Sequence, residues 1–180
     1  MKKLLLIPFL LILLAACGGT SSENQSKDNE EVKETSTNKE LTVDEYVSRI
    51  ENALNEMGDK TNLKIISNEE NEDKIQVITL SENIFIFIEK KGDKVKQVNL
   101  AATTNALLTE KEDLDFAFLL LVGTVDDTLV YKDRYEVVRE LGLSDDNTNI
   151  MDHLKVVNKN KVQYTFKGDN KSLILQAELK

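Results

Sequence analysis

The chain has 180 residues, and its 32 acidic side chains outnumber 23 basic ones, which gives a formal net charge of −9 at pH 7. It contains one Cys, one His, one Pro and no Trp. These counts exclude a disulfide scaffold, a cysteine-built metal site and a collagen-like chain, and the acidic balance argues against nucleic acid as a partner. One Cys and one His leave few nucleophile and base pairs, so we expect that the chain is not an enzyme.

The first seventeen residues have the layout of a secretory signal peptide. Two lysines follow the initial Met, an apolar run covers residues 4–14, and two alanines precede Cys17. As a helix, residues 4–16 would span about 20 Å at 1.5 Å per residue, which is short of the roughly 30 Å core of a bilayer. A cleaved signal peptide over residues 1–16 is therefore favoured over a transmembrane helix.

The sequence Leu-Ala-Ala-Cys at residues 14–17 resembles the lipobox of bacterial lipoproteins, in which a signal peptidase cuts before a lipid-modified cysteine. The resemblance covers residues 1–17 and implies a mature chain that begins at Cys17, with diacylglyceryl and palmitate-type chains as a membrane anchor. Two acyl chains hold a protein on a membrane far more firmly than one, at about 0.8 kcal/mol per buried methylene. The implied location is the extracytoplasmic face of the cell membrane. Ordinary secretion with an incidental Cys is the alternative.

Residues 18–40 differ in composition from the rest of the chain, because Val32 is their only aliphatic residue. Such a segment cannot bury enough apolar surface to offset its ordering entropy, so we expect residues 17–40 to form a disordered tether. Removal of residues 1–16 also removes two lysines and leaves 21 basic against 32 acidic side chains, a formal charge of −11. We expect the mature chain to favour cationic partners or cations.

Residues 41–180 carry the periodic patterns of a single α+β domain with antiparallel sheet structure. Thr42 and Glu45 have the spacing of a capping box, and apolar residues then recur at helical spacing up to Gly58, which predicts a helix over residues 43–57. Both faces of the segment 84–88 are apolar, which predicts a central strand covered on both sides. The strands predicted in this half are residues 63–67, 74–80, 83–89 and 94–100.

Two further helices and three strands are predicted after residue 108. A capping box from Thr109 to Glu112 predicts a buried helix that ends at Gly123, and residues 124–127 predict the start of a helix that runs from about 126 to 141. We expect Val130 and Tyr135 to point inward on this last helix. The final strands are predicted over residues 153–157, 161–166 and 171–179.

Residues 75–100 and 154–179 have similar patterns, and each contains Lys-Gly-Asp at its last hairpin. The similarity suggests two units over residues 41–108 and 124–180, each a helix followed by a meander, with four and three strands. Their sheets would either join edge to edge or stack across the apolar helix between them. Any two meanders with such hairpins can look alike, so duplication remains an open alternative.

Few residues have the pattern of a chemical site. Asp145, Asn147 and Asn149 match the start of an EF-hand calcium loop, but Ile150 stands where the loop needs Gly and Val156 where it needs Glu. They are weak metal candidates, and a turn is the simpler interpretation.

His153 lies beside Asp152 and near Ser144, but no nucleophile elbow or oxyanion loop accompanies them. We name no catalytic residue. No phosphate loop or dinucleotide fingerprint is present, so we also expect no cofactor.

These observations favour a membrane-anchored lipoprotein whose acidic α+β domain binds a protein or peptide partner, as an inhibitor, an immunity or exclusion factor, or an accessory subunit. A lipoprotein that binds a small ligand or a cation is the first alternative, and a structural envelope protein is the second.

Overall fold

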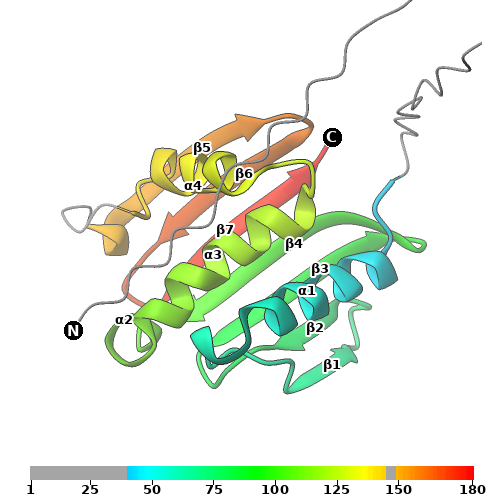
Figure 1. The fold of residues 1–180 in the computed structure, drawn as a ribbon, viewed down its shortest axis with the longest axis horizontal. Coiled ribbons are helices and arrows are strands. Elements are labelled where there is room, and N and C mark those ends of the chain that lie inside the picture. The colour runs from blue at the N-terminus through cyan, green and yellow to red at the C-terminus, as the bar shows by residue number, and fades with distance from the viewer. Residues whose placement is uncertain (1–39, 145–148) are drawn as a thin grey trace, which may run out of the picture. The chain divides into compact units, whose positions relative to one another are not determined.

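The computed structural model describes residues 40–144 and 149–180 as one open antiparallel sheet with its helices on one face (Figure 1). The predicted α+β fold is thus confirmed. The first half contains α1 (Val43–Met57), the short helix η1 (Gly58–Lys60), β1 (Ser67–Glu70), β2 (Gln76–Thr79), β3 (Ile84–Lys91) and β4 (Lys94–Thr103). The second half contains α2 (Ala106–Thr109), α3 (Lys111–Val125), α4 (Tyr131–Glu140), η2 (Ile150–Asp152), β5 (His153–Lys159), β6 (Val162–Gly168) and β7 (Ser172–Leu179).

The seven strands follow the order β1-β2-β3-β4-β7-β6-β5, and every neighbouring pair is antiparallel. The two predicted meanders therefore join edge to edge through β4 and β7, where Leu100 lies opposite Leu175. Stacking of two sheets across the apolar helix, the other arrangement that we considered, is wrong. The duplication itself stays a prediction.

The core lies between the helices and the face of the sheet beneath them. On β3, Ile84, Ile86 and Ile88 are fully buried, because every second side chain of a strand points to the same face. The ring of Phe118 on α3 meets that of Phe166 on β6 edge to face, with centroids 5.8 Å apart. This packing fixes the sheet beneath the helices.

The helix α1 has the predicted bounds. The backbone N–H of Glu45 donates to the Thr42 hydroxyl at 3.2 Å, and Gly58 follows the helix with a positive φ of 51°. The capping box is only half formed, because the Glu45 carboxylate contacts Arg49 instead of returning to the N-cap.

The start and end of α3 differ from the prediction. Thr109 is the last residue of α2, and its hydroxyl donates to the Asn105 carbonyl at the start of that helix. Thr109 therefore does not cap the next helix. Gly123 does not end α3 but lies buried within its last turn, and a Cβ there would stand 2.6 Å from Nη1 of Arg134. Gly123 is thus a point of close approach between α3 and α4. Among the described residues, no helix has both the length and the apolar character needed to cross a membrane.

The predicted start of α4 was also wrong. Asp126 forms a turn in which it accepts bonds from the backbone and hydroxyl of Thr128, at 3.1 and 2.6 Å, and the helix begins only at Tyr131. Val130 therefore lies at the N-cap position before the helix, and both Val130 and Tyr135 are exposed instead of inward.

Two predictions about the strands need correction. The first strand is Ser67–Glu70 instead of residues 63–67: Leu63 is buried, Ile66 is 55% exposed, and the backbone N–H groups of Lys64 and Ile66 bond to the carbonyls of Leu80 and Thr79 outside the regular ladder of β1 and β2. The strand β3 lies inside the sheet between β2 and β4, as predicted, but within the described residues helices cover only one of its faces.

Candidate binding surface

The face of the sheet away from the helices, here called the open face, has no helix over it within the described residues (Figure 1). Strand register places its side chains in rows across the sheet. One row contains Thr79, Phe85, Ala101, Ile174, Lys167 and Leu154. The next contains Val77, Phe87, Asn99, Gln176, Thr165 and Val156.

The two rows mix apolar with neutral polar side chains and include one charged side chain, that of Lys167. Phe85, Phe87 and Ile174 are half-buried by their neighbours, whereas Leu154 is 69% exposed and Val156 is 48% exposed at the β5 edge. Soluble domains normally leave large apolar side chains exposed only singly. The open face therefore has the composition of a contact surface, with its most exposed apolar part on β5.

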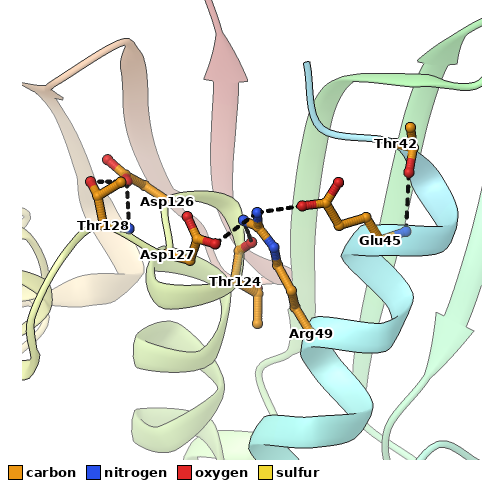
Figure 2. Close-up of polar contacts among 7 residues, drawn as sticks. All are labelled: Thr42, Glu45, Arg49, Thr124, Asp126, Asp127 and Thr128. Atoms are coloured by element: carbon orange, nitrogen blue, oxygen red, sulfur yellow. Dashed lines mark hydrogen bonds and ion pairs between the residues drawn. The ribbon is translucent and has the colours of Figure 1, made fainter. Parts of the chain in front are cut away.

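Arg49 joins α1 to the end of α3 on the other side of the sheet, as Figure 2 shows. Its guanidinium contacts the Glu45 carboxylate at 2.8 Å, the Thr124 carbonyl at 3.1 Å and the Asp127 carboxylate at 2.8 Å. A cation is favourable at a helix C-terminus, where carbonyls lack intrahelical partners. We interpret this cluster as structural. Only the four-residue spacing of Glu45 and Arg49 could have indicated it from the sequence.

Two tyrosine hydroxyls lie in the core near this cluster. Tyr46 and Tyr164 have no exposed surface, and neither hydroxyl forms a hydrogen bond of normal geometry with the described residues. Burial raises the pKa of both tyrosines above the usual value, and the charge of Asp126 raises that of Tyr164 further. The Thr124 hydroxyl partly offsets the rise in the pKa of Tyr46, although it donates its own proton to Leu120 O at 2.7 Å. Both tyrosines are therefore neutral at physiological pH.

A cleft of about 310 Å³ lies between α3 and α4. Its walls include Leu107, Phe118, Leu119 and Tyr135, together with the Lys111–Asp115 ion pair at 2.9 Å. This volume is at the lower end of the range for small-molecule sites, roughly 300–1,000 Å³.

The candidate residues from the sequence do not form a site with one another in the described part of the chain. His153 is held by packing: its Nε2 lies 2.8 Å from the Leu141 carbonyl, and its ring stacks obliquely on Phe166. Asn149 caps the short helix η2 by accepting from the Met151 N–H at 3.3 Å. Cys17, Asp145 and Asn147 lie outside the described residues. Within residues 40–144 and 149–180, no group of three or more His, Cys, Asp or Glu side chains could hold a metal ion.

No protein-family model matches the chain, and neither a curated protein nor a solved structure was found to match it. The geometry of the chain itself is therefore the basis for a functional proposal.

Proposed function

We propose that this chain is a membrane-anchored extracytoplasmic lipoprotein whose folded domain binds a protein partner on the open face of its sheet. The observation that carries the proposal is the one-sided cover of the sheet. Helices bury one face, and the other presents apolar, amide and hydroxyl side chains, with the ammonium group of Lys167, in continuous rows. Such side chains suit contact with another protein more than proton transfer.

The size of the open face supports a macromolecular partner. Seven strands at about 4.8 Å spacing extend over roughly 30 Å, and the two rows cover about 14 Å along the strands. The resulting area of about 400 Å² is about half of the roughly 800 Å² that each partner contributes to a stable protein interface. An inhibitor, an immunity or exclusion factor, or an accessory subunit would each use such a surface.

The anchor can be tested separately from the partner. The resemblance of residues 14–17 to a lipobox predicts that cells fed a clickable palmitate analogue label the full chain and that Cys17→Ser abolishes the label. Ala16→Ser, a change of another small residue beside Cys17, serves as the control and should keep it. Equal labelling of wild type and Cys17→Ser would contradict the anchor.

Photocrosslinking in cells tests the binding surface. A photoreactive residue introduced at Thr165 or Gln176 of the open face should give a discrete adduct with a partner. The same residue at Glu56 or Glu112, exposed on the helix side, should give none. Adducts only from the helix side, or from no position, would contradict the proposal.

A second candidate function is binding of a small molecule in the α3–α4 cleft, which the mixture of apolar walls and an ion pair favours. A thermal-shift screen of the full chain with small metabolites should then find a ligand whose shift is lost in Leu119→Arg. A screen without such a ligand would leave partner binding as the single proposal.

A further inference from the structure

The strand β5 ends the sheet, and Lys155 and Lys159 are its only charged side chains. Among the described residues it pairs with β6 alone, in an unbroken register from His153 to Lys159. It has seven residues, with neither a proline nor a bulge. Exposed edges of this kind are templates for pairing with another extended chain.

The hydrogen-bond pattern of the hairpins shows which backbone groups of β5 are unpaired. The Asp169 N–H donates to the Ser172 carbonyl at 3.0 Å, and the Lys180 N–H donates to the Lys161 carbonyl at 2.9 Å. Antiparallel strands alternate, so odd-numbered residues of β6 bond to β7 and even-numbered residues bond to β5. Their partners on β5 are residues 153, 155, 157 and 159. The N–H and C=O groups of Leu154, Val156 and Asn158 therefore point away from the sheet.

The side chains of this edge add an apolar contact to the free backbone groups. Leu154 and Val156, whose backbone groups point outward, are also the two exposed aliphatic residues of the open face. A strand added along β5 would satisfy the backbone and place its own alternate side chains beside these two.

The charge of the β5 edge is opposite to that of the molecule. Residues 153–168 contain four lysines and no acidic residue, in a chain of net charge −9. Lys159 lies 3.6 Å from Asp133 and 4.0 Å from Glu136, whereas neither Lys155 nor Lys167 forms an ion pair with a described residue. Two copies of β5 would bring like charges together, so the charge favours an acidic segment over self-pairing.

We infer that the β5 edge binds an extended acidic segment of the partner by strand addition. This inference rests on the proposed function and names the chemistry of the partner. The segment alternates apolar side chains, which lie beside Leu154 and Val156 on the open face, with acidic side chains directed toward Lys155 on the other side of the sheet. The partner extends the seven-stranded sheet by one strand.

Fluorescence anisotropy of the purified full chain in detergent tests this inference. The probe is a fluorescein-labelled ten-residue peptide that alternates Val with Glu. We expect it to bind at least tenfold more tightly than a peptide that alternates Val with Lys, and at least tenfold more tightly than a Val/Glu peptide with N-methyl groups along one edge. Equal binding of the methylated peptide would overturn strand addition, and equal binding of the Lys peptide would overturn the acidic specificity.

A matched pair of proline variants locates the binding edge. Val156→Pro removes an outward donor and should weaken binding of the Val/Glu peptide at least tenfold. Asn68→Pro makes the same change at an exposed position of the β1 edge and should alter binding less than twofold. Lys155→Glu should weaken it about threefold. Unchanged binding by Val156→Pro would overturn the assignment to β5.

The outcomes also separate this inference from the proposed function. Self-association that Val156→Pro abolishes, measured by sedimentation, would replace the acidic segment with a second copy of the chain. Photocrosslinking at the open face without peptide binding would overturn strand addition while supporting the proposed function. Peptide binding without any cellular adduct would support the edge while contradicting the open face as the contact surface.

Discussion

The two edges of the sheet are built differently, although each is the outer strand of a helix-linked meander. The strand β1 has four polar residues, and its side chains are bonded to their neighbours: Ser67 to Thr79 at 3.0 Å, Asn68 to Gln76 at 2.6 Å, and Glu70 to Lys90. The strand β5 has seven residues and two exposed aliphatic side chains. A short edge whose side chains are already bonded to their neighbours resists pairing, and a longer edge with outward backbone groups permits it, so we propose that a partner extends the sheet at β5.

The largest effect is expected from proline substitutions that compare the two sides of β5. Val157→Pro removes a hydrogen bond to β6 and leaves the buried carbonyl of β6 without its donor, so the free energy of unfolding should fall by about 2–3 kcal/mol. Val156→Pro removes an outward N–H and should cost less than about 1 kcal/mol. Urea denaturation of the two variants measures both values. Equal losses would show that the deduced direction of the β5 backbone is wrong.

A smaller loss of stability is expected from a change at Asp113, and it should affect the β1 end of the sheet and not the β5 end. Asp113 on α3 accepts from the Thr61 hydroxyl at 2.7 Å and from the backbone and side chain of Asn62, both at 2.9 Å, and so holds the segment that leads to β1. Asp113→Ala leaves these donors without their acceptor and should cost about 1–3 kcal/mol. Hydrogen exchange should accelerate in β1 and β2 but not in β5 and β6. Uniform acceleration would contradict a local role.

The same carboxylate predicts a pH dependence. Burial raises the pKa of Asp113, but the bonds from Asn62 and Thr61 outweigh it and hold the pKa below the usual value. Its contribution to stability is therefore complete above a pH of about 4 and is lost as the pH falls through the lowered pKa of the folded state. Unfolding curves of wild type and Asp113→Asn should converge in acid. A constant difference between them down to pH 2 would contradict this.

The smallest loss of stability is expected from a change at Arg49, and it should affect the β1 and β5 edges equally. Arg49 joins α1 to α3 above the middle of the sheet, so Arg49→Met should lower the free energy of unfolding by about 1 kcal/mol without favouring either edge. Hydrogen exchange of β1 and β5 should rise in equal proportion. A change confined to one edge would show that the Arg49 cluster supports that edge alone.

Local patterns in the sequence were enough for the fold class and for α1, because helical spacing and the Thr42 cap act within a few residues. They failed where a side chain had two available roles. Asp126 has the sequence of an N-cap but bonds to Thr128 in a turn. Phe85 and Phe87 indicate an apolar second face of β3, but a strand pattern does not distinguish cover by the same chain from cover by a partner. The free β5 edge depends on the pairing of β6 with β7, which no local pattern determines.

Hydrogen exchange at the β5 edge tests the central claim most directly. In the free chain, the amides of Leu154 and Val156 should exchange rapidly, because they point away from β6, whereas those of Lys155 and Val157 should be protected. Saturating Val/Glu peptide should protect the first pair by at least tenfold and leave the second pair unchanged. Protection of Leu154 and Val156 in the free chain, or no change when the peptide is bound, would contradict the account.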